Sequence, residues 1–172
     1  LRIEALNVMT TMQVAALNSQ QLSAIGSAFA QNNNTDTNWH DETINISSFT
    51  VAQFQSISWR AIGGLTSTQA SAITTEQMAS LSVTQLRALT TTATQALSSD
   101  QMRSLSTAQI NSLTTDQLSN LSSEQLISLT TTQFQSISNV GMVSLSTHQV
   151  SRLLSSQVAA LSSIQMQAIE TV

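Results

Sequence analysis

The densest group of chemically capable side chains lies in residues 36–42, where carboxylates, an amide, an indole and an imidazole follow one another. Carboxylate and amide oxygens are the ligands that Ca²⁺ takes in proteins. The candidate ligands are Asp36, Asn38, Asp41 and Glu42. The EF-hand pattern is not met, because the sixth-place glycine and the final glutamate at the required distance are both missing. We therefore expect a solvated loop here, with a calcium site as a minor alternative.

The same segment holds the only arrangement that resembles acid–base machinery, with His40 directly before two carboxylates. General acid–base catalysis needs such a group beside a reacting atom. No partner nucleophile is indicated, and the sequence has no phosphate-binding glycine loop and no paired-histidine metal motif. Cysteine is absent, which excludes thiolate metal sites and cysteine nucleophiles. The expectation is a non-enzymatic protein without a cofactor.

The charge balance excludes two further classes of partner. Charged residues make up 8% of the chain, against roughly a quarter in average proteins, and the net charge is −4. The five basic residues are all arginines, scattered along the chain as Arg2, Arg60, Arg87, Arg103 and Arg152. Nucleic acids require a basic stripe, and anionic membranes attract basic clusters, so both partners are disfavoured. No run of 18 apolar residues exists, so membrane insertion is not expected.

One eight-residue phrase organises most of the chain. It reads Leu-Thr-Thr-Asp-Gln-Leu-Ser-Asn at residues 113–120 and returns at residues 121 and 129. With Leu113 as position one, every eighth residue from Phe49 to Ile169 is a large apolar residue, and no insertion interrupts the series. Position two is Ser or Thr in fourteen of the fifteen octads within residues 49–168, and position five is Gln in twelve. This regularity indicates a repeat array.

The phrase contains the signals that start a helix. A capping box places Ser or Thr at the N-cap and Glu or Gln three residues later, and a hydrophobic staple joins the residue before the cap to the fourth helical residue. Leu113 and Leu118 have the staple spacing. The clearest predicted boxes are Thr114 with Gln117, Ser122 with Gln125, and Thr130 with Gln133. At Leu154, the one departure at position two, we expect Ser155 to cap the helix one residue late.

These signals predict an all-α solenoid, a superhelix of very short helices with one helix per octad. A single long helix does not fit, because eight residues overshoot two turns by roughly 80° and the apolar stripe would wind around it. A strand does not fit either, since positions one and six have opposite parity. We predict helices over positions three to eight, burial of positions one and six, and solvent-facing positions four and seven. Such helices are stable only as a stacked array.

The array divides into three parts by how clearly the phrase can be read. Residues 1–32 keep the phase, with Leu1, Met9, Leu17 and Ile25 at position one. Residues 33–48 are an irregular segment that preserves the register, so we expect it to belong to the same solenoid. Residues 49–172 form the regular array. Because the chain starts at Leu rather than Met, we expect it to be part of a longer protein.

The two tryptophans, Trp39 and Trp59, are the candidate interaction residues. Trp59 occupies position three, which is usually polar, so we expect an exposed contact role. Trp39 either packs the irregular segment onto the array or acts as a contact anchor, a role typical of Trp at interfaces. Rows of Thr and Ser at position three also permit an ice-binding interpretation, which Val51, Val83 and Ser123 weaken.

The repeated phrase over residues 49–168 resembles the Ser/Thr/Gln-rich octapeptide arrays of large proteobacterial secreted or surface proteins. That resemblance implies an extended segment between other domains, or a surface for contacts, without catalytic residues. The expected function is a structural spacer or protein-interaction scaffold in a secreted or surface bacterial protein, with an unidentified protein as partner. The alternative is a translocated effector module that binds a host protein.

Overall fold

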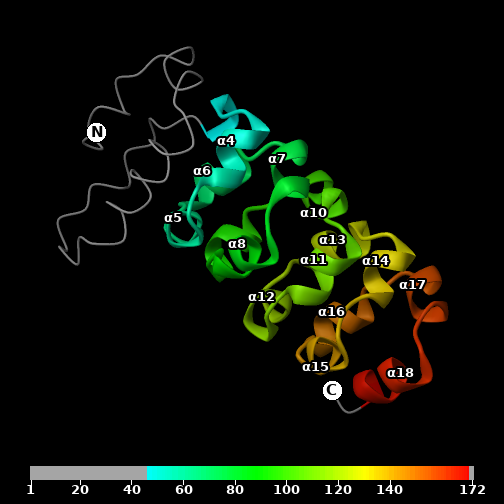
Figure 1. The fold of residues 1–172 in the computed structure, drawn as a ribbon. Coiled ribbons are helices and arrows are strands. Elements are labelled where there is room, and N and C mark those ends of the chain that lie inside the picture. Colours follow the sequence, from blue (N-terminus) through cyan, green and yellow to red (C-terminus); the bar gives the residue numbers. More distant parts are fainter. Residues whose placement is uncertain (1–45, 171–172) are drawn as a thin grey trace.

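The computed structural model describes residues 46–170, and within that range the chain is helical without strands. A 3₁₀ turn at Ile46–Ser48 precedes fifteen short α-helices, which follow one another along an elongated stack (Figure 1). Their bounds are α4 Val51–Ser56, α5 Trp59–Gly63, α6 Ser67–Ser71, α7 Thr75–Ser80, α8 Val83–Ala88, α9 Thr91–Gln95, α10 Ser99–Ser104, α11 Thr107–Ser112, α12 Thr115–Ser119, α13 Ser123–Ser128, α14 Thr131–Gln135, α15 Asn139–Val143, α16 Thr147–Ser151, α17 Ser155–Ala159 and α18 Ser163–Glu170. The predicted all-α solenoid with one short helix per octad is confirmed.

Each helix begins at position three of its octad because position two is the N-cap. The cap at Thr114 has φ −73° and ψ 160°, and the residue before it, Leu113, is also extended with φ −55° and ψ 137°. Two such residues also lie between α4 and α5, between α7 and α8, and between α8 and α9, and they reset the chain direction there. No residue between 46 and 170 has a positive φ, so these turns do not require glycine. This explains why an array with so many turns has only four glycines.

Every helix from α4 to α15 packs against the helix three places later, which gives three octads, or 24 residues, per superhelical turn. The described helices therefore form three stacks. We call them column A (α4, α7, α10, α13, α16), column B (α5, α8, α11, α14, α17) and column C (α6, α9, α12, α15, α18). The repeat phrase did not predict this number, since it depends on how the helices fit together.

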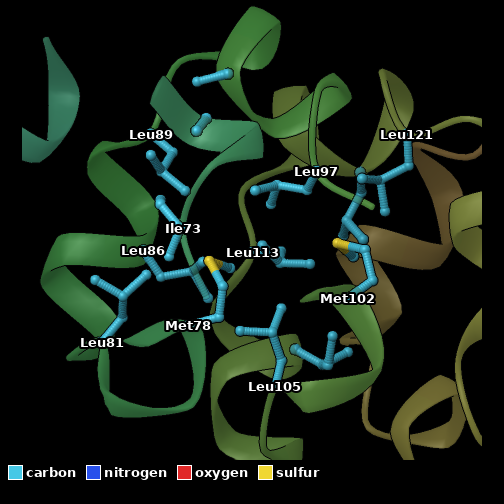
Figure 2. Close-up of a cluster of buried hydrophobic side chains, with 14 of the residues drawn as sticks. Ile73, Met78, Leu81, Leu86, Leu89, Leu97, Met102, Leu105, Leu113 and Leu121 are labelled. Carbon is cyan, nitrogen blue, oxygen red and sulfur yellow. The ribbon is translucent and has the colours of Figure 1, made fainter. Parts of the chain in front are cut away.

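The core runs along the axis between the three columns and is made of positions one and six, as predicted. Figure 2 shows position-one leucines such as Leu81, Leu105 and Leu113 meeting position-six residues such as Met78 and Met102. Position-six side chains are fully enclosed through most of the array. Burying one such side chain contributes roughly 1.5–3 kcal/mol, whereas an N-cap contributes about 1 kcal/mol, so stacking supplies most of the stability.

The expected late cap at Leu154 is wrong. Helix α17 starts at Ser155, in register with its neighbours, and Leu154 itself is the N-cap residue without a side-chain cap bond. The backbone N–H of Leu154 donates to Gln157 Oε1 at 3.2 Å, so half of the capping box remains. Stacking in column B holds the helix start in place even where the hydroxyl is missing.

Candidate interaction surface

The position-five glutamine is the residue on which both the local and the long-range geometry depend. In α12, the backbone N–H of Gln117 donates to Thr114 Oγ1 at 3.1 Å, and the N–H of Thr114 donates to Gln117 Oε1 at 3.0 Å. The same reciprocal pair joins Ser122 with Gln125 and Thr130 with Gln133. The side-chain oxygen of the glutamine is therefore used within its own helix.

The side-chain nitrogen of the same glutamine bonds to the preceding superhelical turn. Gln117 Nε2 donates to the carbonyl oxygen of Leu86 at 3.0 Å and to that of Leu89 at 2.9 Å. These acceptors lie 31 and 28 residues earlier, at the end of a helix and just after it. We call the set of such bonds the glutamine ladder. Its members among the described residues include Gln77, Gln85, Gln101, Gln109, Gln117, Gln125, Gln133, Gln149, Gln157 and Gln165.

The ladder adds donors at the end of a helix, where the geometry of the helix supplies few. The carbonyl oxygen of Leu86 already accepts from the N–H of Leu89 at 3.2 Å, so the glutamine gives it a second bond. An unpaired polar group in a buried place is costly, which makes the bond to Leu89 valuable as well. Gln117 is itself 2% exposed, so its amide and the two carbonyls meet away from solvent. Sequence reasoning identified only the capping role. The sequence did hold a signal for the second role. Glutamate completes a capping box as well as glutamine does, yet no octad from Phe49 to Ala168 has glutamate at position five, which indicates that the amide N–H₂ is needed.

Position seven adds a second, outer set of links between turns. Asn111 Nδ2 donates to the carbonyl oxygen of Ser136 at 2.7 Å, and Arg103 Nε donates to that of Ser128 at 3.3 Å. Both acceptors lie 25 residues later, at position eight of the next turn. Positions four and seven face solvent as predicted in most octads, but long side chains at position seven also hold adjacent turns together.

Trp59 lies on the surface of α5 and is 48% exposed. The guanidinium of Arg60 lies 4.9 Å from the centre of its ring, at cation–π distance. Trp and Arg are enriched among the residues that carry protein–protein binding energy. Trp59 and Arg60 are therefore a candidate site for contact with another protein. The other interaction candidate, Trp39, lies outside the described residues.

A second exposed feature departs from the octad pattern. Val140, Val143 and Ile164 occupy position four or seven on α15 and α18, where other octads carry mainly polar residues. All three are exposed, and Val140 is 69% exposed. Since α15 and α18 are neighbours in column C, these residues lie on stacked helices. We call them the column C patch.

The polar surface between columns is grooved. Gln95 and His148 help to line a groove of about 590 Å³, and Asn111 and Ile164, sixteen places further along, help to line a similar groove of about 610 Å³. The grooves are thus a consequence of the repeat. Within residues 46–170, no three His, Cys, Asp or Glu side chains gather in a way that would hold a metal ion. The candidate calcium ligands Asp36, Asn38, Asp41 and Glu42 all lie outside the described range.

The fold and the ladder define residues 46–170 as an all-helical octad-repeat array with three octads per turn. A family model described as the ALTTAQ repeat matches residues 71–107 and 102–131. The six letters of that name correspond to position eight of one octad followed by positions one to five of the next. Residues 104–109, Ser-Leu-Ser-Thr-Ala-Gln, are an example. Over this stretch the chain is similar to that repeat. Curated proteins and solved structures gave no match.

The helices of the array are short. The longest within residues 46–170, α18, has eight residues. Spanning the hydrocarbon core of a bilayer takes about twenty apolar residues in one helix. In this range, no helix has the length and hydropathy to cross a membrane.

Proposed function

We propose that this chain is a non-enzymatic structural scaffold, which holds apart or presents other protein segments in a secreted or surface bacterial protein. The observation that carries the proposal is the way each turn is joined to the next. A buried apolar core, the glutamine ladder and the outer position-seven bonds all connect residues about 24 to 31 places apart. Such a structure keeps its two ends at a fixed distance. A spacer needs this property, and a flexible linker lacks it.

Distance measurement between two labels tests this rigidity. Cysteine is absent from the sequence, so Thr75→Cys with Thr147→Cys gives one labelled pair. Both threonines are exposed first residues of column A helices, α7 and α16, three superhelical turns apart. We expect spin-label distances with a single narrow distribution. A distribution as broad as that of an unfolded chain of 72 residues would contradict the spacer function.

The exposed Trp59–Arg60 pair supports a contact role for the scaffold. We expect Trp59→Ala to abolish capture of a protein partner from the source organism in buffer of high ionic strength. Its thermal stability should change little, because half of the side chain is already exposed. Val83→Ala, on the neighbouring column B helix α8, is the matched control, since Val83 is also exposed at position three. Equal capture by both variants would remove Trp59 from the proposed surface.

A translocated effector that binds a host protein is the second candidate. The observation that favours it is the complete absence of lysine from the sequence, because lysine is the residue to which ubiquitin is attached. The low content of charged residues would also produce this absence. The origin of the protein that is captured through Trp59 distinguishes the two functions. Capture of a host protein supports the effector, and capture of a protein from the producing organism supports the scaffold.

A further inference from the structure

One buried hydroxyl group in the array has no hydrogen-bond partner. Position three is exposed or half-buried in every other described octad, but Ser123, at position three of α13, is only 7% exposed. Its Oγ is the one buried side-chain oxygen or nitrogen between residues 46 and 170 that makes no hydrogen bond. Leaving such a group unpaired is costly, and native proteins commonly satisfy it with a water, an ion or another bound molecule. The Ser123 hydroxyl therefore needs a partner from outside the chain.

Ser123 lines the groove of about 590 Å³, whose volume is within the ~300–1,000 Å³ of small-molecule sites. This groove lies between α13 and the helix stacked on it, α16, beside the ends of α9 and α12. Besides a glutamine of the ladder, the long polar side chains that line it are Gln95, Asn120, Glu124, His148 and Arg152. The unpaired hydroxyl is thus surrounded by side chains that form hydrogen bonds.

Most of these side chains are available to a ligand. Glu124, His148 and Arg152 are exposed, and their side chains have no hydrogen bond or ion pair with another residue between 46 and 170. Gln95 Nε2 donates to Asn120 Oδ1 at 3.4 Å, so these two amides are held side by side in the groove wall. The groove therefore combines a fixed pair of amides with three side chains that are free to turn toward a ligand.

The similar groove further along the chain does not share this chemistry. Sixteen places after the three unbonded side chains, the sequence has apolar residues, namely Val140, Ile164 and Ala168. The shape of the groove follows from the repeat, since it recurs, whereas the polar side chains around Ser123 do not follow from it. The second groove is therefore a control within the same molecule.

The charges around Ser123 favour an uncharged ligand. Glu124 is negative and Arg152 is positive, so a simple anion or cation would meet a like charge in the groove. A zwitterion would pair with both charges, but it would leave the Ser123 hydroxyl and the two amides without a role. A sugar hydroxyl both donates and accepts, so it can bond to a carboxylate, a guanidinium, an amide or a hydroxyl group.

We propose that the groove around Ser123 binds a neutral sugar, whose hydroxyl groups bond to Ser123 Oγ, Glu124 and Arg152. Ser123 Oγ is covered in the chain alone, so binding requires that an exposed side chain beside it turn away. No Trp, Tyr or Phe lines the groove. Hydrogen bonds must therefore supply the affinity, and a few of them correspond to a Kd of about 1 mM. This site goes beyond the scaffold function and does not use Trp59.

Nuclear magnetic resonance of the whole chain, titrated with maltose, cellobiose or lactose to about 20 mM, tests the proposal, because that range saturates a site with a Kd near 1 mM. We expect the side-chain amide signals of Gln95 and Asn120 to shift and saturate with at least one of these sugars. The amides of Asn111 and Gln135, in the second groove, should stay unchanged.

Ser123→Ala should raise the Kd at least about threefold, because it removes one hydrogen bond to the sugar. It should not lower the melting temperature, since the hydroxyl has no partner within the chain. Ser99→Ala is the matched control, because Ser99 occupies position three of α10, one turn earlier in column A, and does not line the groove. Arg152→Gln should also raise the Kd, whereas Arg87→Gln, at an exposed arginine of α8, should not.

Four results would overturn the proposal. Unchanged amide signals with every sugar would show that the groove does not bind neutral sugars. Equal shifts in the two grooves would indicate non-specific contact with the polar surface. Shifts with glycylglycine and none with the sugars would assign the groove to a zwitterion. A lower melting temperature of Ser123→Ala, with an unchanged Kd, would show that the hydroxyl has a structural partner such as a water.

Discussion

Gln117→Glu is expected to cost about 3–5 kcal/mol of stability, the range for a buried charge that loses its compensation. The substitution keeps the shape of the side chain and one oxygen for the capping box. It replaces the amide that donates to the carbonyls of Leu86 and Leu89 with an oxygen that faces them. Three oxygens then meet at a site where Gln117 is 2% exposed. Urea denaturation followed by circular dichroism measures the loss.

The deficit of this variant should depend on pH with a defined sign. Burial and the two carbonyl oxygens both disfavour the charged form, so the pKa of the introduced carboxyl in the folded chain lies above the ~4.3 of an unfolded glutamate. Between these two pKa values the folded state binds the proton more tightly than the unfolded state. The difference in stability from the unsubstituted protein should therefore shrink as the pH falls, and should be smallest below ~4.

Gln167→Glu is the control, since Gln167 is an exposed residue of α18 at position seven. It should change the stability by less than about 0.5 kcal/mol at any pH, as surface substitutions usually do. A small, pH-independent effect of Gln117→Glu would contradict a structural role for the ladder. The hydrogen bonds of Gln117 Nε2 would then contribute little to the free energy of unfolding.

Leu118→Ala is expected to cost about 2–5 kcal/mol, because it opens a cavity in the middle of the core. Leu118 is 1% exposed and lies at position six of α12. Since stability in a repeat array is a sum over neighbouring units, the array should lose cooperativity at this point. Hydrogen exchange should then show the greatest loss of protection in α12 and in its stacking partners α9 and α15.

Gly141 in α15 offers a direct test of this contact between turns. A Cβ at Gly141 would lie 2.6 Å from Leu118 Cδ1 and 3.0 Å from Ile137 Cγ2. Gly141→Ala alone should therefore destabilise the array, by about 1–3 kcal/mol as for other overpacked cores. In the Leu118→Ala background the closest clash is absent and the new methyl group fills part of the cavity. The two changes should couple by at least about 1 kcal/mol.

The double-mutant cycle with Leu86→Ala is the control. Leu86 is also fully buried at position six, but it lies in α8, which stacks on α5 and α11 rather than on α15. Leu86→Ala and Gly141→Ala should be additive within about 0.5 kcal/mol. Additivity of the Leu118 and Gly141 substitutions would show that α12 and α15 do not share this part of the core.

The start of each helix was predictable because its causes are local. The hydroxyl at position two, the glutamine at position five and the apolar residue at position one act within one octad, so Thr114 and Gln117 predict a helix start without any knowledge of their neighbours. Burial of positions one and six followed from the same phrase. Where the local signal failed, as at Leu154, stacking held the helix start in register.

The number of octads per turn was decided only by the tertiary structure. It depends on how eight-residue units close around a shared core, and residues 24 to 31 places apart meet only after that closure. For this reason the second role of Gln117, which donates to Leu86 and Leu89, could not be placed from the phrase, although the use of glutamine and never glutamate at position five pointed to it. The repeat sequence by itself determined where a helix with a hydroxyl at position two begins and that positions one and six face inward, whereas the burial of the position-five glutamine was not predicted. The stacking of three helices per turn decided which octads touch, because packing acts between residues that the local signals never connect.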